Sequence, residues 1–367
     1  MRIPLVDLAA QQAEVHEEVR AGLDEVFATA AFVGGPAVRR FEAGYAAAVG
    51  ARHCVGVANG TDALELALRA VGVGPGAEVV LPVNTFIATA EAVSRIGAVT
   101  VLVDVDPAHL LVDPAAVRAA VGPRTAAVLP VHLFGQVAPV EELAKIAADA
   151  GVPLVEDAAQ AQGARRNGRP AGALGLVAGT SFYPGKNLGA AGDAGAVTTD
   201  DAEVAHRVRA LAGHGSTQKY RHDVVGMNSR LDTVQAVVLE AKLRRLAGWN
   251  ERRRAAAARY DALLRDLPGV QPPRTDPANE DAWHLYVVQV ADRDRVLAAL
   301  QAAGVGAGVH YPVPVHLTGA YRHLGLGRGA FPVAETAADR ILSLPMHPHL
   351  TAAQQEEVVE VLGRAFA

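Results

Sequence analysis

Short apolar runs alternate with amphipathic helical segments along the first two-thirds of the chain. Apolar residues recur at helical spacing in residues 61–71 and 139–150. Runs rich in β-branched residues, each typical of a strand buried on both faces, occupy residues 78–82 (EVVLP), 100–106 (TVLVDVD), 126–131 (AAVLPV), 152–157 (VPLVED) and 195–199 (GAVTT). This alternation predicts an α/β domain with a mostly parallel central sheet and a ligand site beyond the carboxyl ends of its strands.

The last third of the chain has a different pattern. A long helical stretch at residues 231–267 carries an apolar stripe, and its second half is rich in arginine. A polar loop at residues 271–279 precedes a strand at 283–290, a helix near 293–303 and a final helix from Thr351. We therefore expect two domains, a large α/β domain at residues 1–245 and a smaller C-terminal α+β domain at residues 246–367.

Composition excludes several classes of protein. Of the 367 residues 50% are hydrophobic and 20% are charged, so the chain can bury a sizeable core. The net charge is −5, so we interpret the arginine-rich helix as a solvated face and expect no nucleic-acid partner. The single cysteine, Cys54, rules out an intrachain disulfide, and the histidines lack the spacing of a metal site, so no metal is expected. Without a secretory leader or an apolar run of membrane-spanning length, we expect a cytoplasmic protein with no membrane partner.

Lysine is scarce in this chain, which directs attention to the few that are present. The 34 basic residues include only four lysines, Lys145, Lys186, Lys219 and Lys242. Lys186 lies in the small-residue segment GTSFYPGKNLGAAGDAG at 179–195. A lysine in such a tight loop can lose its proton and act as a Schiff-base nucleophile, for which arginine is no substitute. The alternative is an ordinary lysine in a surface turn; a P-loop is excluded because Asn187 follows.

Three other positions complement this lysine. Asp157 ends a predicted strand, where a carboxylate either binds a protonated ring nitrogen or caps the next segment. Gly60 and Thr61 begin a helix, whose free N–H groups bind a phosphate or are simply capped. Phe86 follows another predicted strand and either covers a ring or packs in the core. A lysine amine, a strand-end carboxylate and a phosphate-binding helix start are together what pyridoxal 5′-phosphate (PLP) requires.

At this point the chain resembles the DegT-type family of nucleotide-sugar aminotransferases, PLP-dependent enzymes with the aspartate aminotransferase (type I) fold. The resemblance covers essentially the whole chain. It begins at IPLVDL and runs through ANGTDAL, VNTFIATAEAV, VEDAAQAQGA, SFYPGKNLGAAGDAGAV, NSRLDTVQA and HYPVPVH to SLPMHP. It implies a large PLP-binding domain and a smaller C-terminal domain, in agreement with the pattern of the elements.

The resemblance also implies a role for individual residues. It makes Lys186 the lysine that binds the cofactor and moves the proton, and Asp157 the partner of the pyridine nitrogen. The further cofactor contacts that it implies are Gln160 on the ring hydroxyl, Phe86 on the ring face, Gly60, Thr61 and Ser181 at the phosphate, and Asn228 reaching a neighbouring subunit's phosphate. The substrate contacts are Arg230 at the donor carboxylate, His310 and Tyr311 at the sugar, and, as further candidates, Tyr183 and Lys219.

By the same resemblance the protein transfers an amino group from an amino acid, with glutamate the expected donor, to a dTDP- or UDP-linked 3- or 4-keto sugar. The reaction would be ping-pong through pyridoxamine phosphate, in a homodimer with shared sites. Residues 213–232 either approach the acceptor or form a polar surface loop. Two alternatives are a PLP-dependent sugar dehydratase or epimerase and a non-catalytic sugar- or PLP-binding regulator; Lys186 argues against the first, since related dehydratases carry histidine there. The pathway stays open between the biosynthesis of antibiotic amino sugars and that of cell-envelope glycans.

Overall fold

The apolar runs form one continuous twisted sheet in the computed structural model, which describes residues 2–218 and 220–366. One part has the strand order β1(His53–Val57), β9(Gly195–Thr199), β8(Val177–Ser181), β5(Val155–Asp157), and the other has the order β3(Val99–Val103), β2(Glu78–Pro82), β4(Thr125–Val128). Parallel bridges from Val128 to Leu154 and from Val131 to Asp157 join β4 to β5. Only β9 runs antiparallel to both of its neighbours in this sheet as described, so the prediction of a mostly parallel sheet is confirmed.

Two strands, β2 and β9, have the predicted bounds, and the others are shorter than their apolar runs. The run at residues 126–131 leaves regular pairing after Val128, two residues before Pro130, which has no N–H to donate to a neighbouring strand. The chain beyond the strands then turns over the carboxyl edge of the sheet, where the polar residues of the site lie.

Alternating residues of each strand face two separate helical layers. In β2, Val79 and Leu81 belong to one apolar cluster and Val80 to another. The first cluster is formed with α4(Gly60–Ala70), α5(Ile87–Arg95) and α8(Ala202–Ala212). The opposite face is covered by α3(Pro36–Val49), α6(Pro114–Ala120), α7(Val140–Asp149) and the long helix α9(Thr233–Leu264). Burial on both faces explains why the strands read as continuous apolar runs.

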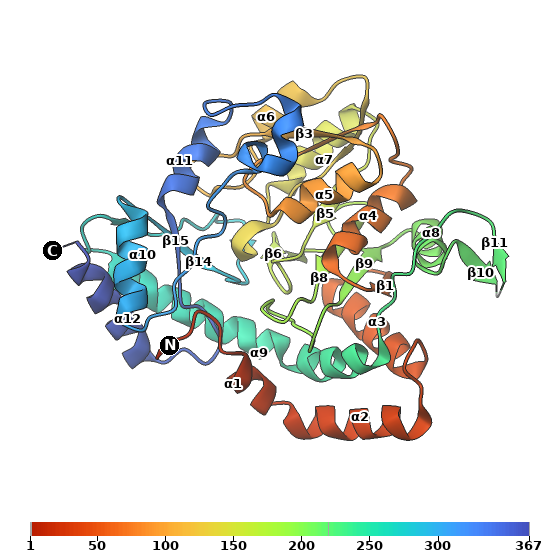
Figure 1. Cartoon of the computed structure of the whole chain (residues 1–367), viewed down its shortest axis with the longest axis horizontal. Helices are drawn as coiled ribbons and strands as arrows, with labels where there is room; N and C mark the ends of the chain where they lie inside the picture. Colours follow the sequence, from red (N-terminus) through yellow and green to blue (C-terminus); the bar gives the residue numbers. More distant parts are fainter. Residues whose placement is uncertain (1, 219, 367) are drawn as a thin grey trace.

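The C-terminal part forms its own apolar cluster at one end of α9, on the side of the molecule where both termini lie (Figure 1). Its elements are β12(Val270–Gln271), β14(Tyr286–Val290), β15(Ile341–Leu344), α10(Arg293–Ala302), α11(Pro332–Arg340) and α12(Ala352–Arg364). Ile3 joins this cluster and pairs with Val305, so the first residues pack on the last third of the chain. The division at 245/246 falls inside α9, which runs through it unbroken, and the two-domain boundary stays a prediction.

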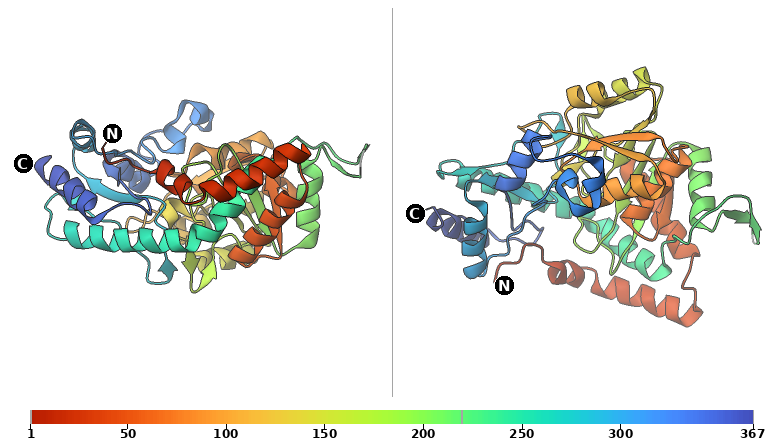
Figure 2. Two further views of the ribbon diagram at one scale, coloured as in Figure 1. Left: turned by 90° about the horizontal axis from the view of Figure 1, so that it is seen from below. Right: turned by 45° about the horizontal axis from the view of Figure 1, so that its top comes forward.

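The remaining elements lie at the periphery. Helices α1(Leu8–Ala13) and α2(His16–Thr29) run along the outer side of α9 (Figure 2). The hairpin β10(Ser216–Gln218)–β11(Arg221–His222) projects from the body of the molecule (Figures 1 and 2). The short pieces are β6(Arg165–Arg166), β7(Arg169–Pro170), β13(Asn279–Glu280), η1(Leu133–Gly135), η2(Val315–Leu317) and η3(Gly319–Leu324). Across residues 2–218 and 220–366, no helix has the length and apolar character needed to cross a membrane.

The apolar stripe of α7 provides a test of the core. Leu143 is 0% exposed among the side chains between α7 and the sheet. Its replacement by alanine removes buried methyl groups and leaves a cavity, so Leu143→Ala should lower the free energy of unfolding by about 2–5 kcal/mol. Leu176→Ala is the matched control, because Leu176 is 41% exposed and its truncation should cost much less. Denaturant unfolding measures both, and equal losses would contradict the assigned packing.

Candidate active site

The predicted cofactor residues meet at the carboxyl edge of two parallel strands. Asp157 is the last residue of β5, and its register partner on β8 is Gly179. The chain that leaves β8 after Ser181 carries Lys186 before it returns as β9. The structure thus brings Asp157 and Lys186 close enough for each to influence the pKa of the other.

The loop that carries Lys186 folds tightly on itself. The Lys186 N–H donates to the Tyr183 carbonyl at 2.8 Å. A Cβ on Gly189 would lie 2.2 Å from the Pro184 carbonyl oxygen, so only glycine permits this turn. Lys242 of α9 donates from Nζ to the Gly189 carbonyl at 2.8 Å and supports the loop from beneath. Burial lowers the pKa of Lys186 to about 8, while Asp157 acts in the opposite direction.

Asp157 is a buried carboxylate without a cation in direct contact. Its Oδ2 accepts from the Thr89 hydroxyl at 2.7 Å and its Oδ1 from the Ala159 N–H at 3.1 Å. None of the ion pairs within the described part of the chain includes it. Burial raises the pKa of Asp157, although these hydrogen bonds and Lys186 oppose that shift. A role in capping the next segment would account for the contact of Oδ1 alone. A protonated ring nitrogen would supply the positive partner that the buried carboxylate does not have among the described residues.

The start of α4 forms an anion cradle with the end of β8. Asn59 caps the helix, because its Oδ1 accepts from the Asp62 N–H at 2.8 Å. The N–H groups of Gly60 and Thr61 donate to no group in residues 2–218 or 220–366, which leaves them for a ligand. A Cβ on Gly60 would lie 2.5 Å from Cβ of Ser181, so glycine is required where the two segments meet. A phosphate fits this arrangement.

Phe86 lies over the site instead of in the core. It precedes α5 and is 51% exposed, which excludes the core-packing alternative. Its ring centroid is 5.1 Å from that of Tyr311. The Tyr311 hydroxyl accepts from Gln160 Nε2 at 2.9 Å, and Gln160 Oε1 accepts from the Phe134 N–H at 2.7 Å. One amide N–H of Gln160 therefore remains for the predicted contact with a ring hydroxyl.

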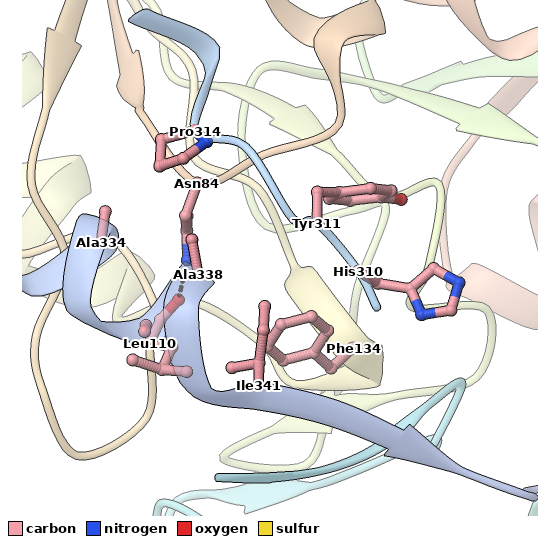
Figure 3. A pocket seen from close by; sticks show the side chains of 10 residues that line it. Asn84, Leu110, Phe134, His310, Tyr311, Pro314, Ala334, Ala338 and Ile341 are labelled. Atoms are coloured by element: carbon pink, nitrogen blue, oxygen red, sulfur yellow. Dashed lines mark hydrogen bonds between the residues drawn. The ribbon is translucent and has the colours of Figure 1, made fainter. Parts of the chain in front are cut away.

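A small, mostly apolar pocket adjoins Tyr311 and His310 (Figure 3). His310 Nδ1 lies 2.8 Å from the Ser343 hydroxyl. Burial and the nearby Lys186 lower the pKa of His310 to about 4, so its imidazole is neutral at pH 7. The pocket is lined by Asn84, Leu110, Phe134, His310, Tyr311, Pro314, Ala334, Ala337, Ala338 and Ile341. Its free volume is about 10 Å³, the space of roughly one water molecule.

Three further predicted site residues, the cofactor residue Asn228 and the substrate residues Arg230 and Tyr183, do not line this pocket. Asn228 and Arg230 are exposed, and their side chains make no hydrogen bond or ion pair to any described residue. Between them, Ser229 accepts from the Ala58 N–H at 3.1 Å, which ties this segment to the chain entering α4. Tyr183 is 59% exposed, and Lys219 lies outside the described residues. The roles predicted for these residues stay predictions.

The sequence analysis missed several residues that support the site. Thr89, which holds Asp157, follows Phe86 by three residues and so lies near it on the start of α5, a signal available from helical spacing.

Glu156 has its side chain on the opposite face of β5 from Asp157. Its carboxylate accepts from His132 Nε2 at 2.9 Å and from the N–H groups of Gly172, Leu174 and Gly175. Burial works to raise the pKa of Glu156, but these donors lower it, so this carboxylate is ionised and holds the fold together.

The low pKa of Lys186 is testable on the protein without ligand. Because burial disfavours the ammonium form, the neutral amine should appear as the pH rises through about 8, well below the ordinary range of a lysine. Amine-reactive labelling followed by peptide mass analysis, from pH 6 to 11, measures this directly. The exposed Lys145 is the internal control and should label with an ordinary profile. Identical profiles for both lysines would contradict the buried site.

Comparison with known proteins places this geometry in a family. The model of the DegT/DnrJ/EryC1/StrS aminotransferase family matches residues 13–363. The chain is 48% identical over 362 residues, 99% of each chain, to the erythromycin biosynthesis sensory transduction protein EryC1 of Saccharopolyspora erythraea. It is 46% identical over 361 residues, 98% of this chain and 95% of the other, to a dTDP-3-amino-3,4,6-trideoxy-alpha-D-glucose transaminase of Streptomyces venezuelae.

Solved structures agree with the sequence relatives. The crystal structure of S. venezuelae DesV in complex with a ketimine intermediate superposes with a TM-score of 0.97 at 46% identity, covering 99% of this chain and 98% of that one. The structure of NtdA from Bacillus subtilis with bound cofactor PMP matches with a TM-score of 0.89 at 30% identity, covering 96% and 82%. The expected type I fold is thereby confirmed. The chain belongs to the DegT/DnrJ/EryC1/StrS aminotransferase family.

Proposed function

We propose that this protein is a PLP-dependent aminotransferase that moves an amino group from an amino acid, with glutamate as donor, to a nucleotide-linked keto-sugar. The observation that carries the proposal is the meeting of the Lys186 amine, the buried Asp157 carboxylate and the anion cradle of α4 at one edge of the sheet. The S. venezuelae transaminase, which is named for a dTDP-linked amino sugar, supports the acceptor class.

The residues of the site fit PLP. When bound, this cofactor supplies an aldehyde that captures amines and a ring that accepts the electrons of the broken C–H bond. The carboxylate of Asp157 would hold the protonated ring nitrogen, for which it now lacks a partner. The N–H groups of Gly60 and Thr61, with the Ser181 hydroxyl, would bind the phosphate, and the exposed face of Phe86 would cover the ring.

Lys186 would move the proton between the donor's α-carbon and the cofactor. Its lowered pKa, about 8, leaves a useful fraction of neutral amine near pH 7, whereas an arginine stays protonated. Neutral His310 would approach the sugar without adding a charge near the lysine. A proton acceptor with a pKa near the working pH is the most effective one.

We further propose that the enzyme is a cytoplasmic homodimer whose sites are shared between chains. Asn228 and Arg230 are exposed and point to no partner within the described residues, as expected of side chains that act on a neighbouring molecule. The hairpin β10–β11, which precedes these two residues in the chain, also projects from the rest of the molecule (Figure 1). The buried free thiol of Cys54 is compatible with the reducing cytoplasm.

The name of EryC1 as a sensory transduction protein favours the regulatory alternative. A regulator that binds only a sugar has no need of a lysine with a lowered pKa beside a buried carboxylate without an ion-pair partner among the described residues, whereas a regulator that binds PLP would use both groups. Lys186 likewise argues against the dehydratase alternative. Turnover with glutamate separates these functions.

The proposed activity is tested by spectra of the protein loaded with PLP. Excess glutamate should convert the cofactor to its amino form and release 2-oxoglutarate, and a dTDP- or UDP-linked keto-sugar should then restore the original spectrum. Lys186→Arg should reduce turnover by more than the ~10²–10⁴-fold typical of losing a general acid–base group, because the amine that binds the cofactor is lost as well.

The control for this test is Lys145→Arg, which makes the same replacement on the exposed face of α7 and should leave turnover unchanged. Near-normal turnover in Lys186→Arg would refute the role of this lysine. Bound PLP that never responds to an amino donor would favour the regulatory alternative.

Shared sites predict complementation between two impaired chains. Asn228→Ala should weaken cofactor binding by about 10-fold or more, the usual cost of a lost hydrogen bond to a charged group. A heterodimer of one Lys186→Arg chain and one Asn228→Ala chain then contains one fully native site. Differently tagged chains, co-expressed and purified as the mixed dimer, should show about half of the native activity under conditions that limit PLP. Activity no higher than that of the Asn228→Ala homodimer would place Asn228 in its own chain's site.

A further inference from the structure

Two buried threonines lie next to the Asp157 carboxylate. Thr85 belongs to the turn between β2 and α5 and is 2% exposed, and Thr89 belongs to the first turn of α5 and is 1% exposed. The Thr89 hydroxyl donates to Asp157 Oδ2 at 2.7 Å, and Oγ1 of Thr85 lies 2.7 Å from Oγ1 of Thr89. Thr85 and Thr89, the threonine pair, thus form a continuous series of hydrogen bonds that reaches from the start of α5 to the end of β5.

Thr89 does not use its hydroxyl as a helical threonine commonly does. Such a hydroxyl usually donates to the carbonyl three or four residues earlier in its own helix. Thr336 of α11 does so, at 2.7 Å from the Pro332 carbonyl oxygen. The Thr89 hydroxyl instead donates to Asp157, a residue 68 positions away in the sequence. A local role in the helix therefore does not explain the orientation of Thr89.

The hydrogen bonds of the threonine pair have a preferred direction. Each hydroxyl has one hydrogen to donate, and an ionised Asp157 only accepts, so Thr89 donates to Asp157 and Thr85 donates to Thr89. A proton on Asp157 Oδ2 would reverse both bonds and leave the hydroxyl hydrogen of Thr85 without another acceptor among the described residues. Because an unpaired buried donor is costly, the threonine pair favours the charged carboxylate.

The second oxygen of Asp157 is also approached by a donor. Its Oδ1 accepts from the Ala159 N–H at 3.1 Å, and a backbone N–H cannot accept in return. Donors from two separate segments, the start of α5 and the chain after β5, therefore hold the two oxygens of one carboxylate. These contacts fix the plane of the carboxylate before any ligand binds, and each oxygen keeps a lone pair for a ligand.

Other titratable groups also act on Asp157. Burial raises the pKa of Asp157, and the two hydrogen bonds to its carboxylate, with Lys186 and His132, oppose that shift. Burial likewise raises the pKa of Tyr311, to which the charge of Asp157 contributes. A hydroxyl-for-methyl replacement in the threonine pair leaves all of these titratable groups in place. Any change in the titration of Asp157 then reports on the hydroxyls.

We propose that Thr85 and Thr89 are positioning residues whose hydroxyls, donating in one direction into Asp157, keep its carboxylate charged and in a fixed orientation for the protonated ring nitrogen of the cofactor. Thr89 contacts the carboxylate, and Thr85 acts through Thr89, because a hydroxyl that donates to a second hydroxyl polarises it and strengthens its donation. This inference rests on the proposed function for its catalytic consequence. In that function the same turn of the chain supplies Phe86 to cover the ring.

The charge of Asp157 is tested on the full-length protein without cofactor. NMR spectra of protein labelled with ¹³C in its aspartate carboxyl groups follow the titration of each carboxylate, and Asp157→Asn identifies the signal. Thr89→Val keeps the shape of the side chain but removes the hydroxyl, so it should raise the pKa of Asp157 by about 1–2, the usual effect of losing a hydrogen bond to a charged group. Thr89→Ser keeps the hydroxyl and should titrate close to the native protein.

Thr85→Val tests the indirect member of the threonine pair. It leaves the contact of Thr89 with Asp157 in place, so it should raise the pKa of Asp157 by a smaller amount than Thr89→Val. Thr336→Val, the matched control on the exposed face of α11, should leave the pKa of Asp157 unchanged. An unchanged pKa in either valine variant of the threonine pair would overturn the proposal, so Thr85→Val decides the matter if Thr89→Val does not fold. A shift in Thr89→Ser as large as that in Thr89→Val would also overturn it.

A second measurement concerns the reaction of the protein loaded with PLP. Thr89→Val should slow the glutamate half-reaction about 10-fold or more with little change in KM, and Thr89→Ser should recover most of the rate. Equal losses in Thr89→Val and Thr89→Ser would mean that the residue only packs. If the native protein itself shows no turnover, the proposed function fails, while the NMR titration still decides whether the threonine pair keeps Asp157 charged.

Discussion

The parallel pairing of β5 with β8 is the constraint on which the rest of the site depends. It places the ends of the two strands at one edge of the sheet, so that Asp157 and the loop after Ser181 must face each other. That loop can turn back into β9 only because Gly189 tolerates the approach of the Pro184 carbonyl. The lysine, the carboxylate and the start of α4 come from three separate segments of the sequence, and the fold of the sheet brings them together.

The adjacent carboxylates Glu156 and Asp157 of β5 face opposite sides of the strand and serve different purposes. Glu156 faces inward, where His132 and three backbone N–H groups satisfy it and keep it ionised. Asp157 faces the opposite side and has only Thr89 and Ala159 as direct partners, so burial raises its pKa. A fully satisfied buried charge stabilises the fold, whereas a partly satisfied one is available to a ligand. In the proposed function, the PLP site uses the second kind.

Two imidazoles that lie near enough to sense the charge of Lys186 are kept neutral. Burial lowers the pKa of Lys186 to about 8 and that of His310 to about 4, and it keeps His284 neutral as well. Neutral imidazoles in this region avoid the repulsion that two further cations would exert on the lysine. Distant parts of the chain share in this arrangement, since His284 and His310 belong to the C-terminal third, on which the first residues also pack.

Local periodicity and motifs of neighbouring residues were enough to predict the sheet-and-helix pattern and the family, and to name Lys186, Asp157, Gly60 and Ser181 as candidates for the cofactor site. Three features became visible only in the folded chain: Phe86 is half exposed, Thr89 donates to Asp157, and Asn187 contacts His284. Thr89 and Asp157 are 68 positions apart in the sequence, and Asn187 and His284 are 97 positions apart. Hydrophobic patterning carries no signal for contacts over such separations. Burial and hydrogen-bond direction arise when separate segments pack, and they are properties of the folded chain.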